Sequence, residues 1–133
     1  MLKLMLVEDG RVLLELPLST RNWDRRELER EFEDFDRDVE RVSKLFNALS
    51  NASRLRMMRA FLDRVDHSLA FTELMNLLDM NPKLVWDSTR RLRRLGLIEK
   101  DDEGRYRSTQ EGEAQFLMAS IALRRLLQIL EEL

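Results

Sequence analysis

The chain of 133 residues contains no cysteine, one histidine, two prolines and four glycines. Without cysteine there is no disulfide framework, no thiolate metal site and no cysteine nucleophile, which fits a reducing, cytoplasmic setting. With His67 as the single imidazole, most general bases and metal ligands are missing. The sequence therefore disfavours an enzyme, and we expect no cofactor and no metal.

Long hydrophobic runs are also missing. The longest stretch without a charged residue has ten residues, 114–123, which is about half of what a bilayer span needs. The first seven residues are apolar but short for a signal sequence, and Glu8 and Asp9 follow where a small-residue cleavage site would stand. We therefore expect neither a membrane span nor secretion.

Charge is abundant and nearly balanced. Charged residues make up 36% of the chain and hydrophobic residues 44%, a globular composition that is too apolar for disorder. The net charge is −2, so the overall balance neither requires nor excludes a nucleic-acid partner. The length suits one compact domain with appendages.

Two β-prone runs, residues 2–7 and 12–16, open the chain. The Asp9-Gly10 pair between them favours a tight hairpin turn, and Pro17 ends the second run. Neither run alternates between apolar and polar residues. We therefore expect both faces of this hairpin to contact protein, either of the same chain or of a second copy.

A long amphipathic helix is predicted next. Asp24 and Glu27 have the spacing of a capping box, and apolar residues then recur in steps of four and three as far as Leu49. This spacing suits packing against another long helix. Residues 21–42 carry six basic and nine acidic side chains, so this segment should avoid a phosphate backbone.

Three shorter helices are predicted after it. The first follows the capping residues 50–53 and has apolar residues as far as Val65. The second starts at Thr72, whose side chain is the expected cap. The third starts at Asn81, with a proline at its first helical position, and ends at Gly96.

A second hairpin and a last helix complete the chain. Residues 97–107 are predicted to form a short, charged hairpin around the polar turn 101–104. Ser108 and Glu111 have capping-box spacing and would open a helix that reaches Leu133. This last helix is apolar over too wide an arc for one neighbour.

Two short helices joined by a tight turn and followed by a basic hairpin are typical of a winged helix-turn-helix. Residues 45–62, LFNALSNASRLRMMRAFL, resemble the opening of the ArsR-like winged-helix regulators. Four further parts match, residues 71–80, 82–95, 96–98 and 106–112. In total the resemblance covers residues 39–120. It implies a DNA-binding transcription regulator in which helix 82–95 enters the major groove, the hairpin is the wing and the terminal helices form a homodimer.

The expected fold is mainly α with small β, a winged helix-turn-helix with an N-terminal β-hairpin and long terminal dimerisation helices. Its segments would be the hairpin in residues 1–20, the winged domain with the long first helix in 21–107, and the dimerisation helix in 108–133. The expected dimer contacts are Phe32, Phe35, Val39, Ile121, Leu127 and Leu130. A two-fold dimer would place two recognition helices roughly 34 Å apart, one DNA turn. In the alternative, the last helix packs only on the long helix of its own chain.

Basic residues concentrate in the predicted helix-turn-helix and wing. Residues 81–107 carry eight basic and five acidic side chains, and residues 43–67 carry five basic and two acidic ones. Phosphate binding requires such a local concentration. The alternative is a solvated, salt-bridged surface in an arginine-rich protein.

Helix 82–95 would turn one face to DNA once its apolar stripe is buried. Groove-reading helices contact bases from their N-terminal half, so the base-edge candidates are Lys83, Trp86, Asp87 and Arg90. Arg90 matches the acceptors of guanine, and Asp87 matches the amino group of cytosine. Two interpretations of Trp86 stay open, contact with a thymine methyl group and packing in the core.

The remaining cations suit the sugar-phosphate backbone. They are Arg91, Arg93 and Arg94 on the helix, and Lys100, Arg105 and Arg107 in the hairpin. Arg105 and Arg107 alternate with Tyr106, which would place both cations on one face of the wing strand. Alternatively, they only solvate an edge strand.

No metal sensing is expected. The metal sensors among the resembled regulators use cysteines on the helix matching residues 72–78, or histidine and carboxylate groups on the terminal helix. This chain has Thr72-Glu73-Leu74-Met75 at the first place and no histidine at the second. For His67, which has two aspartates nearby, a surface or capping role is favoured over a metal site or a pH switch. The seven methionines are interpreted as core filler.

We therefore predict a homodimer that binds a pseudo-palindromic site on double-stranded DNA and regulates transcription, most simply by blocking polymerase. The alternative is a winged-helix module for protein–protein interaction within a larger assembly, where the basic helix meets an acidic partner or solvent. A salt-dependent shift of duplex DNA separates the two. A small-molecule effector is compatible with the first prediction, and the sequence identifies none.

Overall fold

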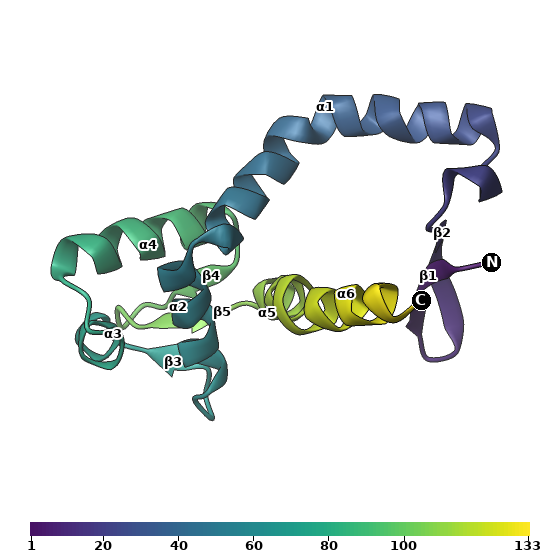
Figure 1. Ribbon diagram of the computed structural model, residues 1–133. Coiled ribbons are helices and arrows are strands. Elements are labelled where there is room, and N and C mark those ends of the chain that lie inside the picture. Colours follow the sequence, from purple (N-terminus) through teal and green to yellow (C-terminus); the bar gives the residue numbers. More distant parts are fainter. The chain divides into compact units, whose positions relative to one another are not determined.

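A computed structural model describes all 133 residues, which form two compact units, Met1–Val42 and Ser43–Leu133 (Figure 1). The division falls within helix α1 (Arg25–Ser50). None of the helices combines the length and the apolar character that a membrane span needs.

The first unit holds the predicted hairpin and most of α1. Strands β1 (Lys3–Glu8) and β2 (Arg11–Pro17) pair antiparallel around Asp9 and Gly10, both at positive φ, as a two-residue hairpin turn requires. A short 3-10 turn, η1 (Thr20–Asn22), precedes α1, and the Asp24 carboxylate accepts a hydrogen bond of 2.9 Å from the backbone N–H of Arg26. Almost all hairpin side chains are exposed within this unit, so the expected contact with a second copy stays a prediction.

The second unit combines helices with a three-stranded antiparallel sheet (Figure 1). Its first helices are α2 (Ala52–Leu62), α3 (Phe71–Leu78) and α4 (Pro82–Arg94). Its strands are β3 (Ser68–Leu69), β4 (Ile98–Lys100) and β5 (Tyr106–Ser108), with β5 in the middle. The sheet is completed by β3, a strand that the sequence analysis missed.

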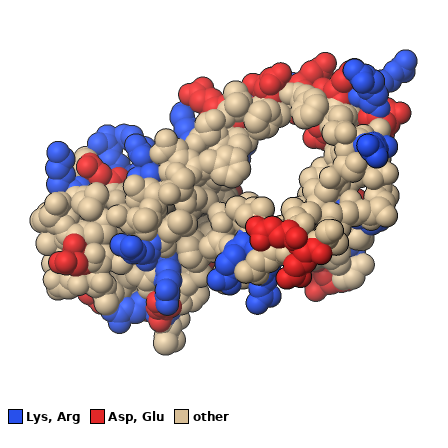
Figure 2. Space-filling model, viewed as in Figure 1, with Lys and Arg blue, Asp and Glu red and all other residues tan.

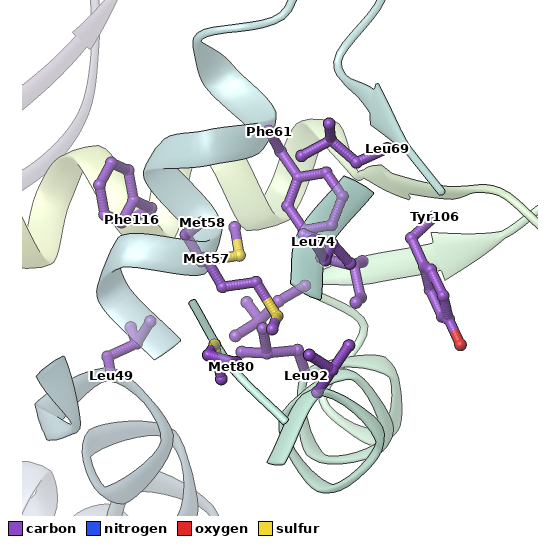
Figure 3. Close-up of a cluster of buried hydrophobic side chains, with 13 residues drawn as sticks. Leu49, Met57, Met58, Phe61, Leu69, Leu74, Met80, Leu92, Tyr106 and Phe116 are labelled. Carbon is purple, nitrogen blue, oxygen red and sulfur yellow. The ribbon is translucent and has the colours of Figure 1, made fainter. Parts of the chain in front are cut away.

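The core of this unit joins the helices to the sheet (Figure 3). Its fully buried side chains come mainly from α2, α3 and α4 and from strands β3 and β4, and include Met57, Met58, Phe61, Leu69, Leu74, Val85, Leu92 and Leu97. Met57, Met58 and Met80 are buried there as predicted, although Met1, Met5 and Met118 are exposed. Because Val85 and Leu92 anchor α4 in this core, the opposite side of that helix must face outward.

Several predicted helix boundaries are wrong by a few residues. Helix α2 ends at Leu62, and Val65 is fully exposed. The helix stops there because the chain must turn before β3, which pairs with β5. Ala70 instead of Thr72 precedes α3. Thr109 instead of Ser108 caps α5, since its hydroxyl accepts a hydrogen bond of 2.9 Å from the Gly112 N–H.

The predicted last helix is interrupted. Helix α5 (Gln110–Leu117) passes through a π-helical segment, η2 (Met118–Ala122), into α6 (Leu123–Glu132). The Ser120 hydroxyl donates a hydrogen bond of 2.6 Å to the carbonyl of Phe116 next to this segment. No residue of α6 is buried, so its apolar side chains lie on the surface of the unit.

Candidate nucleic-acid interface

Helix α4 is fixed at both ends by its own sequence. The Asn81 side chain accepts a hydrogen bond of 2.8 Å from the Leu84 N–H, and Pro82 occupies the first helical position. Gly96 ends the helix at φ +73°. Of the predicted apolar stripe, Val85, Thr89 and Leu92 are buried and Leu95 is half-buried.

The outward side of α4 and the β4–β5 hairpin, which is the predicted wing, carry cations that no carboxylate neutralises. Figure 2 shows Lys and Arg side chains gathered at the left of the view, over the part of the unit that holds α4. Seven exposed side chains have no ion pair within 4 Å, namely Lys83, Arg90, Arg91, Arg93, Arg94, Lys100 and Arg107. The fixed positive charge is therefore available to an external anion.

Trp86 and Arg90 form a stacked pair one turn apart on this outward side. The Arg90 guanidinium carbon lies 4.8 Å from the centroid of the Trp86 ring. Trp86 is 50% exposed, so its contact with Arg90 replaces the alternative of packing in the core. A guanidinium held against an aromatic face loses less conformational freedom when it binds a flat partner such as guanine.

A hollow of about 420 Å³ separates α4 from the wing. Its walls include Trp86, Arg90, Arg93, Lys100 and Tyr106. The Lys100 ammonium nitrogen lies 5.5 Å from the centroid of the Tyr106 ring. The side of α4 that faces the wing is therefore both cationic and aromatic.

A second hollow, of about 350 Å³, follows the other flank of α4 and is bordered by α2. It is lined by Arg54, Asp87, Ser88, Arg90, Arg91 and Arg94. Arg90 lines both hollows and so lies between them. The outward ridge of α4 is thus flanked by cations on both sides.

The two wing arginines have different surroundings. Arg107 is exposed on β5. Arg105 forms an ion pair of 3.1 Å with Glu73 and donates a hydrogen bond of 2.9 Å to the Ser68 hydroxyl, which joins the wing to α3 and β3. The Ala70 N–H, followed by Arg105 and Arg64, lowers the pKa of Glu73 below its usual value. Arg105 is therefore placed to position the wing.

Sequence reasoning missed two residues at this site, Arg54 and Ser88. Arg54 is one of the five basic residues in 43–67, yet it is only 9% exposed, and its guanidinium donates hydrogen bonds to two carbonyls in the last turn of α1. Ser88 is 3% exposed and lies beside Thr89 on the buried stripe. The spacing of Ser88 from Val85 and Leu92, three and four residues, is the signal that could have revealed its burial.

The structure gathers no metal site. No group of three or more histidine, cysteine, aspartate or glutamate side chains lies close enough together to hold an ion. The His67 ring nitrogen Nδ1 contacts the Glu113 carboxylate, which also accepts a hydrogen bond of 2.9 Å from the Ser108 hydroxyl. His67 therefore links the connection between α2 and β3 to α5.

The predicted dimer contacts are exposed in each unit. Phe32, Phe35 and Val39 lie on the exposed part of α1 in the first unit. In the second unit Ile121, Leu127 and Leu130 are each about half exposed. The structure leaves these apolar side chains without a partner in their own units.

Comparison with known proteins supports the fold. No protein-family model and no curated protein matches the chain. Among solved structures, reduced HlyU from Vibrio cholerae N16961 matches with a TM-score of 0.51 and 23% sequence identity, over 65% of this chain and 94% of that chain. The fold is a winged helix-turn-helix.

This assignment confirms the predicted fold class, mainly helical with small antiparallel sheets. A second solved structure, the multiple antibiotic-resistance repressor MarR from Listeria monocytogenes 4b F2365, has a TM-score of 0.48 and 13% identity. The match covers 83% of this chain and 85% of the MarR chain. In this fold, α4 takes the position of the second helix of the helix-turn-helix, and the β4–β5 hairpin takes the position of the wing.

Proposed function

We propose that this protein is an ArsR-like transcription regulator, a repressor that binds double-stranded DNA as a homodimer and performs no catalysis. The observation that carries this proposal is the set of seven exposed cations on α4 and the wing that lack a carboxylate partner. Arg59, Arg64 and Arg105 of the same unit are paired, and Arg56, Arg124 and Arg125 are unpaired on α2 and α6. It is therefore the gathering of seven free cations on α4 and the wing that argues against an ordinary salt-bridged surface.

In the proposed complex α4 lies in the major groove. Lys83, Trp86, Asp87 and Arg90 would face base edges, with Arg90 on a guanine and Trp86 against a neighbouring thymine methyl group. Arg91, Arg93, Arg94, Lys100 and Arg107 would contact the sugar-phosphate backbone on the two flanks. We leave Arg105 out of the proposed contacts because Glu73 and Ser68 occupy its guanidinium.

The proposed dimer rests on the apolar stripe of α6. Leu123, Leu127 and Leu130 follow one another in steps of four and three residues and are each about half exposed. Apolar side chains that recur on one face of an exposed helix mark an interface. A two-fold axis through paired α6 helices would repeat α4 at two half-sites, and Phe32, Phe35 and Val39 of α1 would extend the contact.

Two arginine variants separate base contacts from backbone contacts. Arg90→Ala is expected to weaken binding to the preferred duplex by about 1 to 3 kcal/mol and to relax selectivity at one base pair, because the guanine contact is lost. Arg107→Ala is expected to weaken all duplexes alike, because its target is phosphate. Fluorescence anisotropy with the preferred and a random duplex measures both effects.

Arg59→Gln supplies the control, since Arg59 is exposed on α2 and paired with Asp63, away from α4. Its removal should change neither affinity nor selectivity. If Arg90→Ala lowered the affinity for preferred and random DNA by the same factor, base recognition by Arg90 would be refuted. A protein that bound no duplex at low salt would instead favour the protein-interaction module.

A further inference from the structure

The hollow between α4 and α2 contains more positive charge than its own residues neutralise. Four guanidinium groups line it, those of Arg54, Arg90, Arg91 and Arg94. Asp87 is the one acidic residue on its wall, and its carboxylate forms no ion pair within 4 Å with any of them. The hollow therefore carries a net excess of positive charge at the flank of the recognition helix.

Arg54 is the buried member of this cluster. Its Nε donates a hydrogen bond of 2.7 Å to the carbonyl of Ala48, and its Nη2 donates one of 2.8 Å to the carbonyl of Asn47. Nη1 makes no hydrogen bond within the protein. Burial and the neighbouring charge of Arg91 both lower the pKa of Arg54. Neither Arg54 nor Arg91 has a carboxylate partner within 4 Å, so an external anion would relieve the repulsion between the two charges.

Ser88 adds a second donor to the same hollow. The residue is 3% exposed, and its hydroxyl makes no hydrogen bond within the protein. The hydroxyl oxygen is not itself buried, so it remains accessible from the hollow. Arg91, on the next turn of α4, donates a hydrogen bond of 3.4 Å to the Asn47 side chain, which holds its guanidinium towards the α1 end of the hollow.

We propose that this hollow binds one phosphodiester group of the DNA backbone, held by the Ser88 hydroxyl, Nη1 of Arg54 and the guanidinium of Arg91. The proposal rests on the proposed function and adds two residues to it. Phosphate fits because the hollow offers donors and positive charge, and a phosphodiester presents two anionic oxygens that only accept hydrogen bonds. A free phosphate group has the same chemistry, so the experiment must separate the two sources.

The location favours DNA as the source. Arg90 lines this hollow and also stacks on Trp86 on the outward side of α4. The hollow is therefore adjacent to the side chains that would read bases, at the position where a helix in the major groove meets the wall of phosphates. A phosphate held there by Ser88 and Arg54 would set the depth and the rotation of α4 in the groove.

The first arm of the test measures binding to a random-sequence duplex as a function of salt. Ser88→Ala removes one donor and no charge, so the affinity should fall about tenfold while the salt dependence stays the same. Arg91→Gln should make the negative slope of log K against log salt shallower by about 0.9 for each protomer bound. Arg59→Gln, the matched loss of an exposed arginine on α2, should leave the slope unchanged.

Ser88→Asp gives the sharper result. Its carboxylate would supply the anion that the arginines lack, so binding to any duplex should fall at least about 100-fold. Circular dichroism checks that the Ser88→Asp variant folds. If it does not fold, Ser88→Ala, which fits the same space, still tests the site. DNA binding that is unchanged in Ser88→Ala and in folded Ser88→Asp would overturn the site and leave the proposed function intact.

The second arm uses inorganic phosphate without DNA, at constant ionic strength, with the Arg54 Nε–H and the Ser88 amide followed by NMR. The proposal predicts saturable shifts in the wild type that disappear in Ser88→Asp. If phosphate produced these shifts but no duplex bound, the hollow would serve a free phosphate group, and both the DNA contact and the proposed function would be refuted. If DNA bound in a Ser88-dependent way, the backbone would be established as the source.

Discussion

Gly112→Ala is expected to destabilise the protein by at least about 3 kcal/mol and to lower its Tm by roughly 10 °C. A Cβ atom at this position would lie 2.1 Å from the carbonyl oxygen of Leu97 and 2.7 Å from its carbonyl carbon. Both are backbone atoms, so no side-chain rotation relieves the clash. The start of α5 would have to move away from the strand that leads into the wing.

The junction has little freedom to make that move. The Thr109 hydroxyl donates a hydrogen bond of 2.7 Å to the carbonyl of Gly96, and the Thr109 N–H donates one of 3.1 Å to the carbonyl of Leu97. The same hydroxyl accepts from the Gly112 N–H. Separation of α5 from Leu97 would therefore break this set of hydrogen bonds as well as the packing.

Gly96→Ala is the control for this prediction. Gly96 has φ +73°, and no atom lies within 4 Å of its would-be Cβ, so the cost is backbone strain alone, about 1 to 2 kcal/mol. Urea titration gives both free energies of unfolding. In a helix without such a contact, glycine to alanine stabilises by about 1 kcal/mol, so a Gly112→Ala variant as stable as the wild type would disprove the close approach.

Leu127→Asp is expected to convert the proposed dimer to monomers and to lower the affinity for a two-half-site duplex at least about 100-fold. A carboxylate in the middle of the α6 stripe cannot be buried without a partner. Once the protomers separate, each α4 binds its half-site alone, and the gain from linking two sites is lost. Light scattering and anisotropy with the same duplex measure the two effects.

Gln128→Asp places the same carboxylate one residue further along the exposed helix, so it serves as the matched control. It should stay dimeric and bind normally. A Leu127→Asp protein that remained dimeric would show that the copies associate elsewhere, with Phe32, Phe35 and Val39 of α1 as the next surface to test.

The elements that depend on local rules are the ones the sequence predicted well. The Asp9-Gly10 turn set the first hairpin, because those residues tolerate the positive φ values that a two-residue turn needs. Asn81 and Gly96 set the two ends of α4, through a side-chain cap and a left-handed stop. The exposed face of α4 followed from the same periodicity.

The features that the sequence did not show depend on partners far along the chain. Strand β3 has two residues and exists because β5 supplies its hydrogen bonds, nearly forty positions away. Arg105 has the same local pattern as Arg107, yet Glu73 and Ser68 hold it within the unit. The burial of Arg54 follows from where α1 ends relative to α2. No local spacing encodes these three contacts.

The most direct test of the central claim is the salt dependence of wild-type binding to duplex DNA. Anisotropy titrations from about 50 to 200 mM salt should use a duplex selected from random sequences and an unselected duplex. The free cations of α4 and the wing predict that log K falls linearly with log salt for both, with a slope of about −0.9 for each phosphate contacted. The selected duplex should bind at least about 1,000-fold more tightly. Affinity that did not change with salt, or the absence of binding at 50 mM, would contradict the account.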